Sequence, residues 1–173
     1  PPHEGHVNIS KAALTKMKLN EIWWIVTSRN PFKLKSSLFS KRYKETRDYV
    51  SDKNIKIIKL DEKKSAFTID TVLYLKKKYP NYNFIWLMGS DNLIELHKWK
   101  RWKEIFYNIP IAIFDRPLYS FSLTKFKSLV YFRKEKVSKS LIKKFKNFEP
   151  PAWIFIDGLA NFQSSTKIRN KSS

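Results

Sequence analysis

Two histidines flank a glycine in His3-Glu4-Gly5-His6, just before the first helical pattern of the sequence. Two imidazoles three residues apart at a helix N-terminus can point at one anion, together with exposed backbone N–H groups and the positive end of the helix dipole. Gly5 lets a ligand approach the backbone closely. The spacing therefore predicts a phosphate-binding site. The alternative is a polar N-terminal tail with incidental histidines.

A second candidate anion site is Ser164-Ser165-Thr166-Lys167-Ile168-Arg169, after the last predicted strand. A serine here can cap a helix, so that hydroxyls and the N–H groups of the first turn would face an anion. Arg169 would follow after roughly one turn and reach the same anion with its fork of donors. An ordinary capped helix explains the same pattern without a ligand.

A third segment, Met88-Gly89-Ser90-Asp91-Asn92, ends an apolar run. Gly89 suits close approach of a ligand, and Asp91 suits acceptance of hydrogen bonds from ribose hydroxyls. An N-cap by Ser90 or Asp91 in a βα turn is the alternative. Trp99 is either a ligand contact or part of the buried stripe of a helix, with Leu93, Leu96, Trp102, Ile105 and Phe106.

The segment Lys136-Val137-Ser138-Lys139-Ser140 invites comparison with the K-M-S-K-S loop that accompanies H-x-G-H in class I aminoacyl-tRNA synthetases. Such a match carries little weight in a chain this rich in Lys and Ser. We interpret Ser138 instead as the cap of a helix over residues 139–146.

Strand and helix patterns alternate along the chain and must position these residues. Short apolar runs predict strands at 22–27, 55–58, 84–88, 111–114 and 153–156. Periodic segments predict helices around 6–19, 37–50, 68–79, 91–107 and 138–147. Alternation of this kind predicts an α/β fold with a mostly parallel sheet, whose ligands bind outside the carboxyl ends of the strands. Residues 1–173 are expected to form a single domain.

The composition excludes several sites. With three glycines the chain can hold neither a G-x-G-x-x-G turn nor a P-loop. Without cysteine it has no disulfide, thiolate zinc site or cysteine nucleophile, which fits a reducing compartment. No apolar run approaches the ~18 residues of a membrane helix. We expect a cytoplasmic protein without a membrane partner.

The charge is strongly positive, with 35 Lys+Arg against 15 Asp+Glu. A net charge of +20 fits a nucleic-acid binder, a protein that binds anionic membranes or an enzyme of phosphorylated substrates. Because lysines such as Lys76, Lys77 and Lys78 are scattered between apolar residues, we interpret the excess as a generally basic surface. A basic RNA-binding protein, with steeply salt-dependent binding, is the alternative from another functional class.

Taken together, these motifs resemble the nucleotidyltransferases of the H/T-x-G-H superfamily, above all the bacterial nicotinate-nucleotide adenylyltransferases. The resemblance implies a Rossmann-like open parallel sheet with helices on both faces. Pantetheine-phosphate and cytidylyl relatives, the alternative within the superfamily, share the first and last motifs but not the middle ones. Besides the histidine and serine motifs, the resemblance rests on Trp24 to Val26, Asn30 to Lys33, Phe67 to Thr71, Trp86 to Leu93, His97 to Trp99, and Asp115 to Pro117.

The resemblance implies adenylyl transfer from ATP to nicotinate mononucleotide, giving deamido-NAD and pyrophosphate in NAD biosynthesis. Mg²⁺ would enter with ATP, held mainly by phosphate oxygens and water. No stable nucleic-acid partner is expected, and a homo-oligomer is left open.

The resemblance also implies a function for each matching residue. His3, His6 and Arg169 would be catalytic. ATP would be bound by Gly5, Gly89, Asp91, Arg116, Ser164, Ser165 and Thr166, although Leu118 stands where the family usually has a glycine after Arg116-Pro117. Nicotinate mononucleotide would be bound by Lys33, Thr68 and Trp99, with Trp99 stacking on the nicotinate ring.

The sequence departs from the family pattern at its start. Family members have a strand and a G-G-x-F-x-P turn before H-x-G-H, whereas Pro1-Pro2 precede it here without an initiator Met. We therefore expect that the first strand is missing, that the 173-residue polypeptide folds poorly or is inactive, and that a version extended upstream is active. Equal specific activity of the two versions would refute this expectation.

Overall fold

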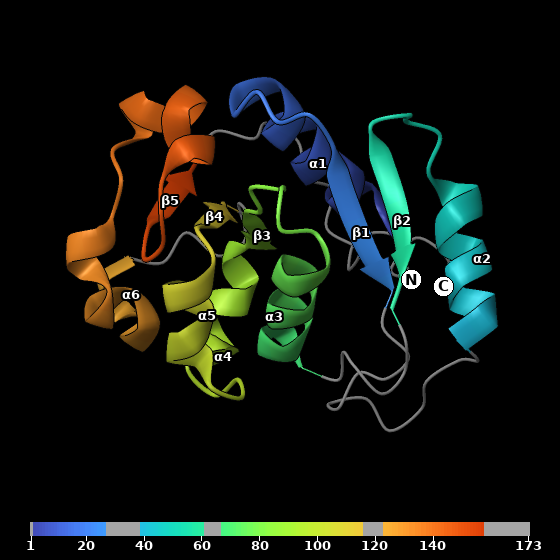
Figure 1. Cartoon of the computed structure of the whole chain (residues 1–173). Helices are drawn as coiled ribbons and strands as arrows, with labels where there is room; N and C mark the ends of the chain where they lie inside the picture. The colour runs from blue at the N-terminus through green and yellow to red at the C-terminus, as the bar shows by residue number, and fades with distance from the viewer. Residues whose placement is uncertain (1, 27–38, 61–66, 116–122, 158–173) are drawn as a thin grey trace, which may run out of the picture.

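The computed structural model describes residues 2–26, 39–60, 67–115 and 123–157 as alternating strands and helices (Figure 1). The strands are β1 (Ile22–Val26), β2 (Ile55–Lys59), β3 (Trp86–Gly89), β4 (Ile111–Phe114) and β5 (Trp153–Ile156). The longer helices are α1 (Glu4–Lys16), α2 (Phe39–Tyr49) and α3 (Thr68–Lys78). Each strand lies within two residues of its prediction, and the α/β class is confirmed.

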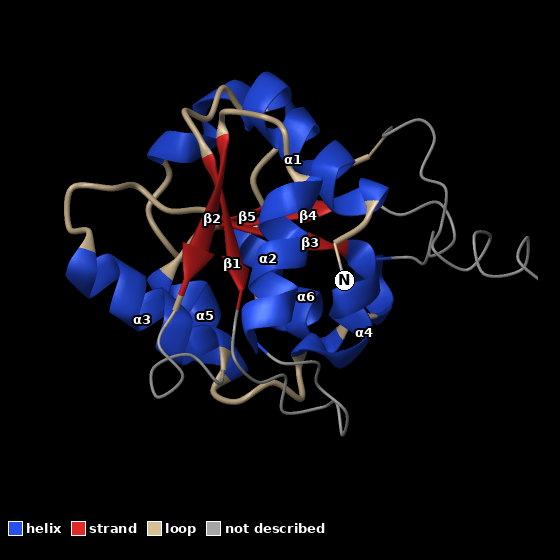
Figure 2. Ribbon diagram, turned by 90° about the vertical axis from the view of Figure 1, so that its right-hand side faces the viewer, coloured by secondary structure: helices blue, strands red, loops and turns tan. Residues whose placement is uncertain are grey.

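All strand pairs are parallel, as predicted, and the strands are divided between two sheets. β1 pairs with β2, and the other sheet has the order β3-β4-β5. Figure 2 shows the β1–β2 pair turned relative to the three-stranded sheet. Among the described residues β1 and β3 make no strand pair, and both strands line the same cavity. All four residues of β4 are fully buried, as expected for a central strand covered on both faces.

Helix α1 packs against both sheets. Its buried residues Ile9, Ala13 and Met17 belong to one hydrophobic cluster. The same cluster contains Ile22 and Ile55 of the first sheet and Ala112, Phe114, Ile154 and Ile156 of the second. Apolar burial on α1 therefore joins two sheets that share no strand pair among the described residues.

A second hydrophobic cluster lies beside the three-stranded sheet, around α3 and the helices that follow β3 (Figure 1). Those helices are the 3₁₀ turn η1 (Ser90–Asn92), α4 (Leu93–Leu96) and α5 (Trp102–Asn108). The continuous helix predicted over 91–107 is therefore wrong, because the chain breaks between α4 and α5 at Arg101, which has a φ of 51°. The stripe itself is confirmed: Leu93, Leu96, Ile105 and Phe106 are buried, and Trp99 and Trp102 pack against them half-buried.

Contacts with α3 hold this break. Lys100 Nζ lies 3.3 Å from a carboxylate oxygen of Asp70, in the first turn of α3, and 4.4 Å from the centre of the Phe67 ring. Arg101 contacts Asp70 at 3.9 Å and also binds Glu104. Asp70 and Phe67 lie at the start of α3, so these contacts of Lys100 and Arg101 join the break to α3, whereas the i,i+3 pair with Glu104 is one that a continuous helix would also allow.

The remaining helices precede β5. Ser138 caps a helix as expected, accepting a hydrogen bond from the Ser140 backbone N–H at 3.4 Å, but that helix is the 3₁₀ helix η5 (Lys139–Asn147). Three short helices were not predicted: η3 (Leu123–Lys125), α6 (Lys127–Tyr131) and η4 (Arg133–Glu135). Segments of three to five residues are too short to display a helical period.

None of the helices in the described part of the chain has the length and hydrophobicity needed to cross a membrane.

The packing identifies Phe106 as a core residue. It is 0% exposed and stacks on Phe132 with ring centroids 4.2 Å apart. Phe106→Ala is expected to lower the free energy of unfolding by about 3–5 kcal/mol, because it leaves a cavity. As a control, Ile94→Ala truncates a side chain that is 45% exposed, and should change the stability by less than about 1 kcal/mol. Urea titration measures the free energy of unfolding of both variants. Equal losses in the two would contradict the assignment of Phe106 to the core.

Candidate active site

The two histidines lie at the N-terminus of α1. His3 is the N-cap residue, with extended backbone angles (φ −151°, ψ 164°), and the His6 N–H donates to the His3 carbonyl at 2.9 Å. The imidazole rings stack with centroids 3.8 Å apart and an interplanar angle of 28°. The two imidazoles therefore lie against each other at the start of a helix, and anion binding by them stays a prediction. Gly5 between them is buried, whereas His6 is exposed.

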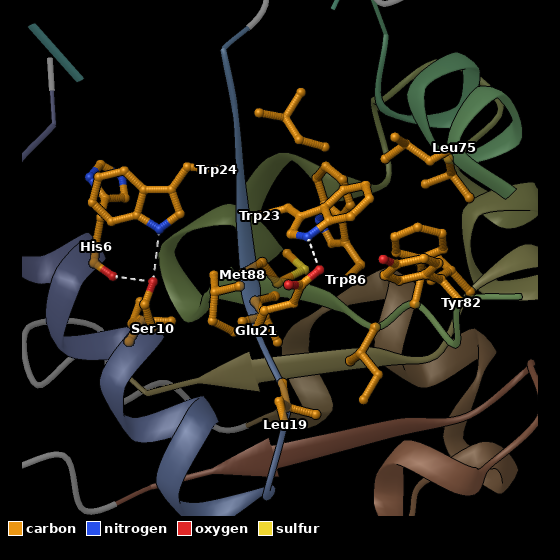
Figure 3. A pocket seen from close by; sticks show the side chains of 18 of the residues that line it. His6, Ser10, Leu19, Glu21, Trp23, Trp24, Leu75, Tyr82, Trp86 and Met88 are labelled. Carbon is orange, nitrogen blue, oxygen red and sulfur yellow. Dashed lines mark hydrogen bonds between the residues drawn. The ribbon is translucent and has the colours of Figure 1, made fainter. Parts of the chain in front are cut away.

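Hydrogen bonds connect the His6 backbone to strand β1 (Figure 3). The Ser10 hydroxyl donates to the His6 carbonyl at 2.9 Å, and the Trp24 indole N–H donates to the Ser10 Oγ at 2.8 Å. The Trp24 ring also meets the His6 ring in an edge-on contact with centroids 5.8 Å apart. Sequence analysis did not identify Ser10 or Trp24 as site residues. The spacing i, i+4 places Ser10 beside His6 on a helix, but only tertiary structure brings Trp24 there.

A cavity of about 1210 Å³ lies beside this first turn and is lined by β1 and β3 (Figure 3). His6, Ser10 and Trp24 line it, together with Gly89 and Asn92. The structure thus brings His6 of the H-x-G-H motif and the turn after β3 to one cavity, whose lining includes neither His3 nor Gly5.

Gly89 ends β3 and is buried. Its φ of −79° and ψ of 154° are accessible to any residue, so the conformation does not require glycine. It lies on the cavity wall, and close approach of a ligand at this glycine stays a prediction. The N-caps here are Gly89 and Asn92, neither with a side-chain capping bond, so capping by Ser90 or Asp91 is wrong.

The segments of Thr68 and Trp99 meet outside that cavity. Thr68 begins α3, and half-buried Trp99 packs against the cluster that includes α3 residues. The ion pair between Asp70 and Lys100 joins the two segments. Neither Thr68 nor Trp99 lines the cavity, and Asp91 in η1 does not line it either.

The other predicted site residues fall outside the part of the chain that the structure describes. They are Lys33, Arg116, Ser164, Ser165, Thr166 and Arg169.

One carboxylate on the cavity wall has a shifted pKa. Lys56 binds Glu21 and lowers the pKa of its carboxyl group, and the Trp23 indole N–H, which donates to Glu21 at 2.6 Å, lowers it further. The same bond raises the pKa of Lys56. Over the described residues, no three His, Cys, Asp or Glu side chains gather as metal ligands.

Comparison with known proteins identifies the family. A family model described as cytidylyltransferase-like matches residues 1–171. A probable nicotinate-nucleotide adenylyltransferase of Rhizobium johnstonii is 35% identical over 176 residues, which cover 100% of this chain and 88% of that protein. The chain belongs to the nicotinate-nucleotide adenylyltransferase family. A family member of Brucella abortus with the same description is also 35% identical, over 98% of this chain and 89% of its own length.

Two solved structures share the fold of this nicotinate-nucleotide adenylyltransferase family member. Plasmodium falciparum nicotinic acid mononucleotide adenylyltransferase complexed with NaAD superposes with a TM-score of 0.65 at 18% identity, over 98% of this chain and 78% of the other. The same enzyme complexed with APC gives a TM-score of 0.58 at 21% identity. The Rossmann-like fold class is confirmed.

The pair Glu21–Lys56 predicts a pH-dependent contribution to stability. Because folding lowers the Glu21 pKa, the pair stabilises the fold above the unfolded-state pKa, and this stabilisation is lost as the pH falls through the folded-state pKa. Glu21→Gln should therefore lower the urea midpoint at neutral pH, and the difference from wild type should shrink at about pH 3. The control Glu95→Gln changes an exposed carboxylate on α4. If Glu21→Gln lowers the urea midpoint by the same amount at both pH values, the contribution of the ion pair is contradicted.

Proposed function

We propose that this chain transfers the adenylyl group of ATP to nicotinate mononucleotide, giving deamido-NAD and pyrophosphate in NAD biosynthesis. The observation that carries the proposal is the 35% identity, over the whole chain, to relatives named for this activity. The cavity shared by His6 and Gly89 supports it. In this proposal residues 1–173 act as one nucleotidyltransferase domain in the cytoplasm.

The reaction needs no nucleophile from the protein. An oxygen of the mononucleotide 5′-phosphate bonds to the α-phosphorus of ATP, the bond from that phosphorus to the bridging β-phosphate oxygen breaks, and pyrophosphate leaves. A phosphate is already a competent nucleophile, so catalysis consists of holding the reactants in line and stabilising the charge that develops.

The helix N-terminus is suited to that stabilisation. The stacked imidazoles of His3 and His6 lie beside the N–H groups of the first turn of α1, where the helix dipole is positive. Donors fixed before the reaction need no reorganisation when charge builds on the α-phosphoryl oxygens. The proposal assigns His3 and His6 to the ATP phosphates for this reason.

The other assignments belong to the same proposal. Gly89 and Asp91, at the carboxyl end of β3, would contact the adenosine ribose. Thr68 and Trp99 would bind the nicotinate group, and Lys33 the phosphate of its mononucleotide. The remaining residues would bind the ATP phosphates: Gly5, Arg116, Ser164, Ser165, Thr166 and Arg169.

Nucleotidyltransferases of this family generally use ATP with a divalent metal ion. We propose Mg²⁺, which enters as part of the nucleotide substrate, because it binds phosphate oxygens and retains several waters.

Pyrophosphate release tests the substrates. The assay uses both the 173-residue chain and a version extended upstream. Release from ATP by the active version is expected to require both Mg²⁺ and nicotinate mononucleotide, and a parallel assay with nicotinamide mononucleotide measures the preference between the two. Release that does not depend on a mononucleotide would overturn the substrate assignment. Tight, steeply salt-dependent retention on RNA with no pyrophosphate release would favour an RNA-binding protein.

Substitution of His6 and Trp99 separates their assigned functions. His6→Ala should mainly lower kcat, by about 10²-fold, because its contact strengthens as charge develops. Trp99→Ala should mainly raise KM for the mononucleotide, because stacking stabilises the bound substrate and the transition state equally. Steady-state kinetics with each substrate varied measures both effects. The reverse pattern would contradict the assigned geometry.

A further inference from the structure

Trp24 makes two separate contacts with the first turn of α1. Its indole N–H reaches the His6 carbonyl through the Ser10 hydroxyl, with bonds of 2.8 Å and 2.9 Å. Its ring contacts the His6 imidazole directly, at a centroid distance of 5.8 Å and an interplanar angle of 67°. One side chain of β1 therefore contacts the His6 ring directly and is linked to the His6 backbone through Ser10 (Figure 3).

The Ser10 hydroxyl has a single orientation in this chain of bonds. A hydroxyl has one proton to donate, and that proton goes to the His6 carbonyl. Its oxygen accepts from Trp24, and Ser10 is only 2% exposed, so water has little access to it. The link between β1 and α1 is thus both directional and shielded.

His6 needs such support because its own side chain is exposed. An exposed side chain can populate several staggered rotamers. The Trp24 ring on one side and the stacked His3 ring on another restrict the imidazole to the orientation seen here.

We infer that Trp24 is a positioning residue for adenylyl transfer: acting with Ser10, it holds the His6 imidazole toward the cavity that Gly89 also lines. The inference rests on the proposed function. Loss of the support would leave the substrate sites in place and misdirect the group that stabilises developing charge. Such misplacement affects kcat more than KM.

The neighbouring tryptophan provides a matched control. Trp23 and Trp24 are adjacent on β1, so their side chains point to opposite faces, as Figure 3 shows. The Trp23 indole donates to Glu21, and its ring packs among Tyr79, Tyr82 and Phe84. Trp23→Phe therefore removes an indole N–H from the same strand without touching His6.

The experiment compares Trp24→Phe, Ser10→Ala and Trp23→Phe in the same pyrophosphate assay. Trp24→Phe and Ser10→Ala should each lower kcat about tenfold, with an unchanged KM for nicotinate mononucleotide. Combining them should lower kcat no further than the larger single effect, because both interrupt one chain of bonds. Ser10→Thr, which retains the hydroxyl, should lose less kcat than Ser10→Ala, and Trp23→Phe should keep the wild-type kcat. Thermal unfolding checks that each variant is folded. If Trp24→Phe is unfolded, the comparison of Ser10→Ala with Ser10→Thr tests the inference.

NMR gives a readout that does not depend on activity. The chain has three histidines, and Ser10→Ala should shift the imidazole signals of His6 and leave those of His97 unchanged. An active enzyme whose kcat and His6 signals are both insensitive to Ser10→Ala would overturn the inference. So would an equal loss of kcat in Trp23→Phe. If neither the 173-residue chain nor a version extended upstream releases pyrophosphate while the His6 signals still respond, the proposed function fails and the positioning of His6 by Trp24 and Ser10 stands.

Discussion

The structure depends on the burial of one face of α1 against two sheets. Ala13 and Met17 are 0% exposed, and their cluster contains residues of both sheets. Since the sheets share no strand pair among the described residues, apolar burial has to hold them together, at about 25 cal/mol for each Å² removed from water. The same helix begins at the two imidazoles. The packing that joins the sheets therefore also places His6 on the cavity wall, with His3 stacked on it.

The charged groups around the cavity narrow the range of anions that the strong positive charge could serve. A charge of +20 by itself fits nucleic acid as well as a small anion. On the cavity wall, the Glu21 carboxylate is paired with Lys56, and the histidines lie at the positive end of a helix dipole. This arrangement suits phosphorylated small molecules, and the membership of the nicotinate-nucleotide adenylyltransferase family agrees with it.

The sequence predicted strands better than long helices. The predictions 111–114 and 153–156 coincide with β4 and β5, because a short apolar run buried on both faces has one simple local pattern. The predicted helix over 91–107 failed for a different reason. Its apolar stripe is present and buried, but Lys100 and Arg101 pair with Asp70 on another helix, and that contact is not visible in local periodicity.

The sequence alone determined the order of the strands and longer helices, the parallel pairing of the strands and the proximity of His3 to His6. These features follow from local geometry, since residues three apart on a helix share a face and apolar runs form strands. Only the tertiary structure decided that the strands divide between two sheets, that Gly89 shares a cavity with His6, and that Trp24 supports His6 through Ser10. Trp24 and Ser10 are fourteen residues apart on different elements. Their contact exists because α1 packs across the sheets, and no periodicity in the chain encodes it.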